Sequence, residues 1–306
     1  MLQGESILRL EQYINDNFTE IISKIINSKG RLIVSGIGKS ANVAQKMVST
    51  FNSTGQPSIF MHAADAIHGD LGNVQANDIV LFISKSGNTE EIKVLVPLIK
   101  NMGNSIIAMT ANLDSFVANN SDWIINTYVE KEACPNNLAP TCSTTAQLVM
   151  GDALAVCLLE SRGFKDIDFA RYHPGGTLGK KLLLKIGELC LNRPAPQVSI
   201  NSSISEVIVE ISKNRLGASA IIQNNKLRGI ITDGDIRRML EDNIKWYDFK
   251  AIDIMNSSPK TINDDHLASD ALKIMKQNNI SQIVVLKENK YMGIVHIHEI
   301  LKEGIF

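Results

Sequence analysis

The stretch from Ile79 to Ile92 constrains the fold of this chain more than any other. Its first five residues, Ile79–Ile83, are all apolar, and they end abruptly at the polar turn Ser84–Thr89. An uninterrupted apolar run of this length is typical of a parallel strand that is covered on both faces. A helical apolar pattern follows, opened by Glu90 and Glu91. The order of strand, polar turn and helix predicts one unit of an α/β sheet.

The turn itself has the composition of an anion site. It offers three hydroxyl groups, on Ser84, Ser86 and Thr89, together with Gly87 and the backbone amides of a helix N-terminus. These groups suit an anion, above all a phosphate. An ordinary helix N-cap requires one hydroxyl rather than three. We therefore predict that this turn binds phosphate.

Length and charge exclude several classes of protein. The 306 residues suggest two or three domains, and 31 basic residues against 32 acidic ones give no excess that would favour nucleic acid. No run approaches the ~18 apolar residues of a membrane span, and the N-terminus lacks the order of a signal peptide. The four cysteines have no Cys-x-x-Cys spacing, which favours reduced thiols in a cytoplasmic protein.

Strand and helix patterns alternate over the first half of the chain. Strands are expected at 31–37, 58–61, 79–83, 105–110 and 123–127, with helices between them, before them at 5–28 and after them to about residue 159. This alternation predicts a parallel sheet with helices on both faces. Ligands on such sheets lie at the carboxyl ends of the strands, so Lys39, His68 and the Ser84–Thr89 turn should meet there.

The loop after the first strand, Gly36–Ala41, admits two familiar interpretations that fail. A P-loop would need glycine where Ile33 stands. The dinucleotide fingerprint is satisfied, but the second strand ends at His62 instead of the acidic residue that would hold a ribose. We interpret the loop as a polar connection whose Lys39 faces a small phosphorylated ligand, the alternative being a solvated lysine at a helix start.

A rigid turn near residue 173 aims a histidine. His173 precedes Pro174, Gly175 and Gly176, and proline fixes one backbone dihedral while the glycines permit unusual ones. An exposed loop histidine is the alternative.

Residues 31 to about 183 resemble the sugar isomerase (SIS) domain of the D-arabinose-5-phosphate isomerase family. The motifs that carry the resemblance are Gly36-Ile-Gly-Lys-Ser40, His68-Gly-Asp-Leu-Gly72, Ser84-Lys-Ser-Gly-Asn-Thr89, Lys131-Glu-Ala-Cys-Pro135, Ala139-Pro-Thr-Cys-Ser-Thr-Thr145, Met150-Gly-Asp-Ala-Leu154 and His173-Pro-Gly-Gly176. The resemblance implies a flavodoxin-like three-layer αβα domain with a five-stranded parallel sheet, in a homotetramer.

The resemblance also implies functional residues. It assigns catalytic roles to Lys39, His68, Glu91, Glu132 and His173, and substrate or phosphate binding to Gly36, Ser40, Ser84, Ser86, Gly87, Thr89, Ser143 and Thr144. Lys85 departs from the family, many members of which carry a smaller polar residue such as asparagine; it either alters substrate fit or adds a phosphate contact. From the residues alone, Glu91 could be only a first-turn helix acid, and Glu132 an exposed loop carboxylate.

The implied reaction interconverts D-arabinose 5-phosphate and D-ribulose 5-phosphate through an enediol and supplies 3-deoxy-D-manno-octulosonate for lipopolysaccharide synthesis. It requires a base, an acid and a cation at the developing oxyanion. Lys39 is the expected electrophile, and the base is Glu132 or His173. No cofactor or metal is required, although the histidines could capture inhibitory Zn²⁺. The alternative is a non-catalytic sugar-phosphate or sugar-nucleotide binding or regulatory protein.

The rest of the chain contains two copies of one sequence pattern, and both copies resemble CBS domains. The predicted domains are 1–184, 185–245 and 246–306, the last two forming a tandem α+β pair. The first copy keeps a candidate adenosyl-nucleotide site at Gly229, Thr232 and Asp235, whereas the second has His296 and Glu299. A purely structural module is the alternative. His296 and His298 would lie on opposite faces of an extended strand, which disfavours joint metal binding.

Overall fold

The computed structural model describes residues 2–191, 193–241 and 245–306. They divide into two compact units, residues 1–169 and 170–306, and each unit is described by itself. The predicted end of the first CBS copy, at residue 245, adjoins residues 242–244, which lie outside the described part of the chain.

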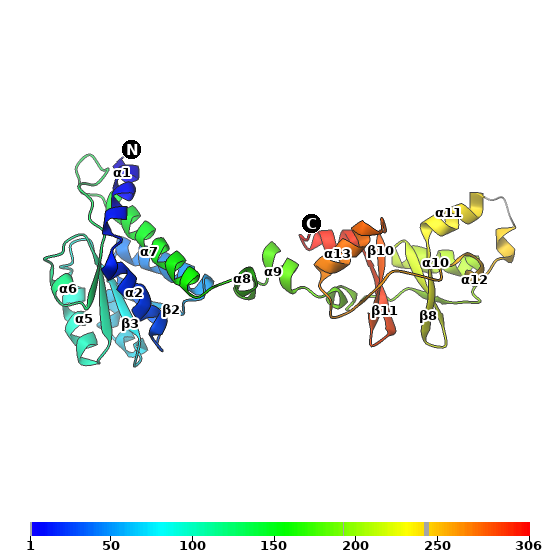
Figure 1. Ribbon diagram of the computed structural model, residues 1–306, viewed down its shortest axis with the longest axis horizontal. Coiled ribbons are helices and arrows are strands. Elements are labelled where there is room, and N and C mark those ends of the chain that lie inside the picture. Colours follow the sequence, from blue (N-terminus) through cyan, green and yellow to red (C-terminus); the bar gives the residue numbers. More distant parts are fainter. Residues whose placement is uncertain (1, 192, 242–244) are drawn as a thin grey trace. The chain divides into compact units, whose positions relative to one another are not determined.

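A five-stranded sheet forms the centre of the first unit, as predicted (Figure 1). Its strands, in the order β2-β1-β3-β4-β5, are all parallel. The order reverses between β1 and β3, and ligands of open α/β sheets bind where this happens. The strands are β1 (Leu32–Gly36), β2 (Ser58–His62), β3 (Ile79–Ile83), β4 (Ser105–Thr110) and β5 (Trp123–Asn126).

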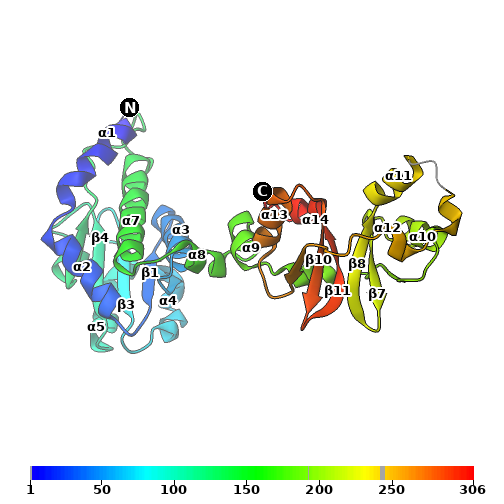
Figure 2. The same cartoon turned by 45° about the vertical axis from the view of Figure 1, so that its right-hand side comes forward.

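Helices cover both faces of this sheet, because alternate residues of the apolar strands point to opposite sides. In β3, for example, Leu81 packs with α2, α3 and α7, whereas Phe82 packs with α4, α5 and α6. Figure 2 shows α2 and α7 over the same face, where they contact each other. The helices are α1 (Leu2–Leu8), η1 (Arg9–Tyr13), α2 (Asp16–Asn27), α3 (Lys39–Ser53), α4 (Ala63–Ala66), η2 (Asp70–Asn73), α5 (Glu90–Asn101), α6 (Phe116–Asn119) and α7 (Cys142–Ser161).

The N-terminal segment differs from the single helix predicted over residues 5–28. The chain becomes extended at Ile14, and Asn15 starts a new helix by accepting a hydrogen bond from the backbone N–H of Phe18. Asparagine is a favoured N-cap because its side chain satisfies an amide that the helix cannot. Local capping has therefore divided a continuous apolar pattern into α1, η1 and α2.

Helix α7 is the one helix in the described residues that is long and apolar enough to cross a membrane. Half of its apolar window is buried within the protein. Met150, Leu154 and Leu158 lie in the core with the sheet and α3. These properties fit a helix at the centre of a protein core.

The second unit contains two matching α+β copies, as the repeated sequence pattern predicts. The sheets are β6-β7-β8 and β11-β10-β9, and each has the same β-bulge in its hairpin. The first copy comprises β6 (Gln197–Ser199), α10 (Ile204–Asn214), β7 (Ala218–Gln223), β8 (Lys226–Thr232) and α11 (Asp233–Glu241). The second comprises β9 (Thr261–Asn263), α13 (Ala268–Gln277), β10 (Gln282–Lys287), β11 (Lys290–His296) and α14 (Ile297–Lys302). The remaining helices are α8 (Asp166–Tyr172), α9 (Thr177–Leu183), η3 (Ile186–Cys190), η4 (Trp246–Asp248) and α12 (Ala251–Ile254).

The two copies bury their sheets against each other. Ala220 and Ile230 of the first copy share a core with Val284 and Ile294 of the second. Neither three-stranded sheet could cover this face alone, so the pair forms one folding unit.

His296 and His298 do not lie on one extended strand, which was the condition on which the sequence placed them on opposite faces. Strand β11 ends at His296, and His298 lies in the first turn of α14. The ring centroids are therefore only 4.9 Å apart, and the backbone N–H of His298 donates to His296 Nδ1. Even so, no cluster of three or more metal-ligating side chains occurs in the residues that the structure describes.

We expect the first unit to fold without the second. All the buried residues of its two apolar cores lie between Leu10 and Leu158 in the sequence. A chain that ends at Leu184 therefore contains both cores. Its thermal midpoint should stay within about 5 °C of the corresponding transition in the full chain, a shift that represents only one or two kcal/mol. Circular dichroism during heating measures this. A chain ending at Thr141 lacks α7 and should not fold; insoluble protein from the longer truncation would show that the units share one core.

Candidate active site

The Ser84–Thr89 loop is preorganised at the N-terminus of α5. The Ser84 hydroxyl is buried and hydrogen-bonds the Thr89 hydroxyl at 2.8 Å, and it accepts from the backbone N–H of Gly87 at 3.1 Å. These bonds close the loop. Ser86 is exposed, and its hydroxyl accepts a long hydrogen bond, 3.3 Å, from the backbone N–H of Asn88. Among the predicted hydroxyls, those of Ser84 and Thr89 therefore shape the loop, whereas Ser86 is exposed to solvent.

Gly87 is required by the shape of this loop. Its φ is +65°, which side chains rarely permit, and a Cβ there would collide with the Ser115 side chain. Its carbonyl accepts from the backbone N–H of Val117 at 3.0 Å, which ties the loop to α6. The glycine identified from sequence is thus needed for backbone conformation and close packing.

Lys39 and its neighbours lie at the end of β1. Gly36 is the buried last residue of the strand, and Lys39 is the exposed first residue of α3. The Ser40 hydroxyl donates to Gln147 on α7 at 3.3 Å, so it links two helices on the same face of the sheet. Lys39 is therefore available to a ligand, whereas Ser40 also has a structural partner.

His68 and Glu91 follow β2 and β3. His68 lies in the exposed connection after α4, and Glu91 is a half-buried residue in the first turn of α5. Because the strands are parallel, the segments that follow them, and that carry His68, Lys39 and Glu91, leave the same edge of the sheet.

Glu132 is buried, not exposed as the simplest interpretation would have it. Its side chain is 1% exposed, and its carboxylate accepts five hydrogen bonds. Thr141 donates through its backbone N–H at 2.8 Å and its hydroxyl at 3.2 Å. Ser143 donates through its N–H at 3.2 Å and its hydroxyl at 2.5 Å, and Lys85 Nζ completes the set at 2.7 Å.

These contacts decide the charge of Glu132. Burial alone would raise its pKa, but the Lys85 ammonium, the Ser143 hydroxyl and the backbone amides lower the pKa to about 2. The carboxylate is thus ionised at neutral pH and holds its charge firmly. A base of such low pKa is a weak acceptor for a carbon-bound proton.

Ser143 and Thr144, which were predicted to bind substrate, form hydrogen bonds within the protein instead. Thr141 and Lys85 contact Glu132, and the sequence analysis did not predict these contacts. The Ser143 hydroxyl donates to Glu132, and the Thr144 hydroxyl donates to the carbonyl of Thr141 at 3.1 Å. Thr141 was not predicted, and Lys85 was noted only as a departure from the family. The cluster of Ser and Thr residues at the start of α7 was the available signal, since such residues cap helices.

His173 belongs to the second unit, where it lies in the turn between α8 and α9. Its N–H donates to the carbonyl of Ala170 at 3.1 Å, and its carbonyl accepts from Gly176 N–H at 3.1 Å. A Cβ at Gly179 would collide with that same carbonyl. The turn is therefore as rigid as the sequence suggests, but the role of His173 stays a prediction.

A second candidate site lies between the CBS copies. A cavity of about 410 Å³ is lined by Thr232, Asp235 and Arg238 of the first copy and by Lys260 and Ser281 of the second. Thr232 donates its N–H and hydroxyl to Asp235 at 2.8 and 2.6 Å, and Arg238 pairs with the same carboxylate at 2.5 Å.

Gly229, the third residue predicted for this site, is required by close packing against a neighbouring backbone. A Cβ there would collide with the carbonyl oxygen of Asn256, which accepts from Ile230 N–H. In the second copy, His296 N–H likewise donates to Glu299, which pairs with Arg193. The strand-end cap is therefore common to both copies.

The buried Glu132 charge should make the first unit sensitive to acid. Its folded pKa of about 2 lies below its ordinary 4.5, so it adds stability above pH 4.5 that is lost as the pH falls toward 2. Wild type should lose on the order of 2–3 kcal/mol more than Glu132→Gln between these limits. Denaturant unfolding followed by circular dichroism at several pH values measures this. Glu130→Gln, which removes an exposed carboxylate paired with Arg9, is the control and should follow wild type. Parallel curves for wild type and Glu132→Gln would contradict this assignment.

Comparison with known proteins agrees with the two-part architecture. Residues 24–157 match the SIS domain family, and residues 186–242 and 251–305 match the CBS domain family. A Haemophilus influenzae protein named "Probable arabinose 5-phosphate isomerase" is 43% identical over 296 residues, covering 96% of this chain and 88% of that protein. The Pseudomonas aeruginosa arabinose 5-phosphate isomerase KdsD is 41% identical over 307 residues, covering 99% of this chain and 94% of that protein.

A solved structure from Escherichia coli CFT073, in complex with arabinose 5-phosphate, matches with a TM-score of 0.53 and 40% identity. It covers 56% of this chain and 94% of its own. The full-length matches, taken with the parallel sheet and the duplicated module, show that this chain belongs to the arabinose 5-phosphate isomerase family.

Proposed function

We propose that this protein is an aldose–ketose isomerase that interconverts D-arabinose 5-phosphate and D-ribulose 5-phosphate through an enediol. The observation that carries the proposal is the closed Ser84–Thr89 loop at the N-terminus of α5, joined through Lys85 to the buried carboxylate of Glu132. A phosphate held by such a loop places a short sugar next to charged groups on the same sheet edge. The names of the curated relatives and the sugar-phosphate complex of the E. coli protein support this substrate.

The reaction moves protons only. A base removes the proton from carbon 2, a proton is delivered to carbon 1, and another moves between the two oxygens. The exposed ammonium of Lys39 is suited to stabilise the enediolate oxygen as charge develops. His68 and Glu91 are candidates for the oxygen-to-oxygen transfer. While Lys85 lies on its carboxylate, Glu132 is a poor base, so His173 is our first candidate for removing the proton from carbon 2 of the bound sugar, and Glu132 is a candidate only when Lys85 has left it.

Several finer properties belong to the same proposal. We expect a cytoplasmic homotetramer that acts in the supply of 3-deoxy-D-manno-octulosonate and needs no cofactor, with Zn²⁺ as an inhibitor captured by histidines. The four free cysteines fit a reducing compartment. Exposed apolar side chains such as Val156 on α7 and Leu8 at the end of α1 fit burial between subunits.

Kinetics of two variants should separate phosphate binding from chemistry. Ser86→Ala loses a hydrogen bond to the phosphate in ground and transition states alike, so KM should rise about 10- to 100-fold with kcat nearly unchanged. His173→Ala should cut kcat by about two to four powers of ten with little change in ligand affinity. Steady-state assays with chelator present measure kcat and KM, and calorimetric titration measures the ligand affinity.

Solvent deuterium should enter at carbon 2 during turnover by the wild type. A protein that binds both pentose phosphates but converts neither, from about pH 6 to 9, would instead be a non-catalytic binding protein. Near-normal kcat in His173→Ala would move the base to another residue.

We also propose that an adenosyl nucleotide is an effector at the CBS pair. The 410 Å³ cavity joins both copies, and Arg238 and Lys260 bring two cations to its lining, as a nucleotide phosphate requires. The Asp235 carboxylate is suited to ribose hydroxyls.

Calorimetric titration with AMP, ADP and ATP tests this site. Asp235→Ala should weaken binding at least 10-fold, because a hydrogen bond to a charged group is worth ~1.5–3 kcal/mol. Glu299→Ala alters the equivalent acid of the second copy and should leave the affinity unchanged. Absence of binding by all three nucleotides would favour a structural role for the pair.

A further inference from the structure

Lys85 carries an ion pair across the candidate active site. It lies between Ser84 and Ser86 in the phosphate loop, and its Nζ is 2.7 Å from Oε1 of Glu132. The two side chains differ in exposure: that of Lys85 is 45% exposed and that of Glu132 is 1% exposed. The lysine therefore reaches from solvent to a buried anion, and its side chain remains partly accessible to a ligand.

The backbone of Lys85 and the carboxylate of Glu132 are each held in place by hydrogen bonds other than the ion pair. The Lys85 carbonyl accepts from Ala111 N–H at 3.1 Å and from the Thr110 hydroxyl at 3.2 Å, which fixes the backbone at the end of β4. Glu132 keeps four donors from Thr141 and Ser143 if the lysine leaves. A carboxylate with four remaining hydrogen bonds is not stranded. The flexible side chain of Lys85 can therefore move without disturbing either anchor.

A phosphate in the same loop would compete for this ammonium. Sugar phosphates carry about −1.5 to −2 charges at neutral pH, whereas Glu132 carries one charge that four other donors already stabilise. Lys85 is attached between two of the predicted phosphate-binding serines, and its ammonium is a flexible point charge with three donors.

We propose that Lys85 is a positioning and specificity-determining residue that pairs with Glu132 in the empty site and transfers to the phosphate when substrate binds. This inference rests on the proposed function of the loop. Within the described residues, transfer removes the only full positive charge bonded to Glu132, so the carboxylate becomes a stronger base only when a phosphorylated sugar is present. The exchange breaks one ion pair and forms another, with no covalent step. A sugar without phosphate would leave Glu132 paired and inactive.

A double-mutant cycle on phosphate binding tests the exchange without requiring turnover. Inorganic phosphate is titrated calorimetrically into wild type, Lys85→Met, Glu132→Gln and the double variant. If Glu132 competes for Lys85, Glu132→Gln should tighten phosphate binding about 3- to 10-fold, and this gain should vanish in the Lys85→Met background. Lys85→Met alone should weaken binding. An equal gain in both backgrounds would show simple repulsion between the two anions and overturn the proposal, as would no gain at all.

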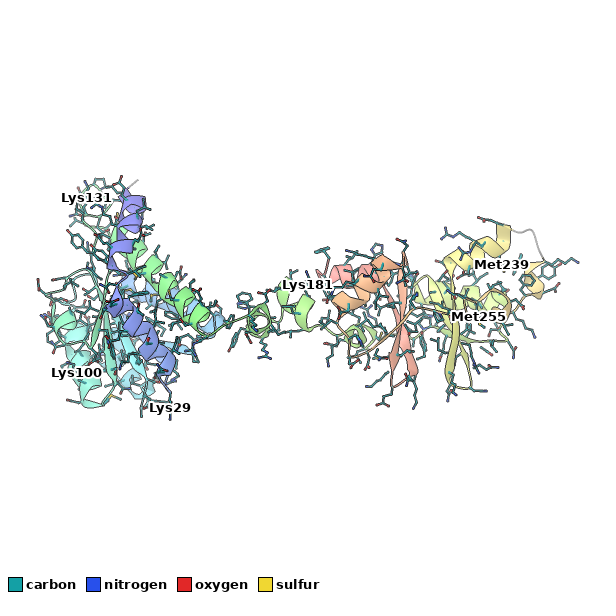
Figure 3. The ribbon with its side chains drawn as sticks, viewed as in Figure 1. Lys29, Lys100, Lys131, Lys181, Met239 and Met255 are labelled. Atoms are coloured by element: carbon teal, nitrogen blue, oxygen red, sulfur yellow. The ribbon has the colours of Figure 1, made fainter. Side chains whose placement is uncertain are left out.

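Two controls locate the effect. Lys100→Met removes the same charge near the other end of α5, about 15 Å along the helix, and should leave phosphate affinity unchanged (Figure 3). Ser86→Ala should weaken binding; if it does not, phosphate lies outside this loop and the proposal fails. The isomerase function is tested separately, by turnover. A protein that shows the coupled phosphate binding but no turnover would support the Lys85 exchange and contradict only the proposed isomerase function.

A crystal structure of the unaltered protein with phosphate bound avoids any effect of Glu132→Gln on folding. Nζ of Lys85 should lie within hydrogen-bond distance of the phosphate and away from Glu132. A lysine that keeps its contact with Oε1 of Glu132 beside a bound phosphate would overturn the proposal.

Discussion

The burial of both faces of the parallel sheet is the constraint on which the first unit depends. Strand β3 contributes Leu81 to one core and Phe82 to the other, and both are fully buried. Each such side chain contributes about 1.5–3 kcal/mol when removed from water. A strand covered on both sides has no room for an ionised group, so polar chemistry is confined to the ends. The reversal of strand order between β1 and β3 then selects one part of the carboxyl edge.

Glu132 differs from the other candidate site residues because its charged side chain is buried, in a loop between β5 and α7. The segment between β5 and α7 is irregular, and the carboxylate fixes it to the first turn of α7 through Thr141 and Ser143. An anion at a helix N-terminus is stabilised by the unpaired amides there. The loop is further closed by Asn137, whose side chain accepts from the N–H of Glu132. The Glu132 carboxylate therefore orders the loop and also belongs to the candidate active site, so the stability of the loop and the proposed chemistry depend on the same charge.

The sequence was most informative where a structural feature is local. The five strands follow from apolar runs, and the loop at Ser84–Thr89 follows from a cluster of hydroxyls beside a glycine. The contact of Lys85 with Glu132 joins residues 47 positions apart, and it depends on strand order and side-chain direction, which no local pattern contains. The break at Asn15 was readable as a capping residue but was outweighed by the helical apolar spacing. The turn after His296 had a similar signal in Glu299, three residues later.

The CBS copies show why a motif requires its surroundings. The acid three residues after the strand accepts the N–H of the strand's last residue in both copies, and an arginine pairs with it in both. In the first copy that arginine is Arg238, on the same helix as Asp235; in the second it is Arg193, from a preceding segment. The cap alone is therefore a structural device, and a ligand site additionally needs the cavity that Lys260 and Ser281 complete. A nucleotide that engaged Asp235 would also have to share or displace Arg238, so its binding would alter the first turns of α11.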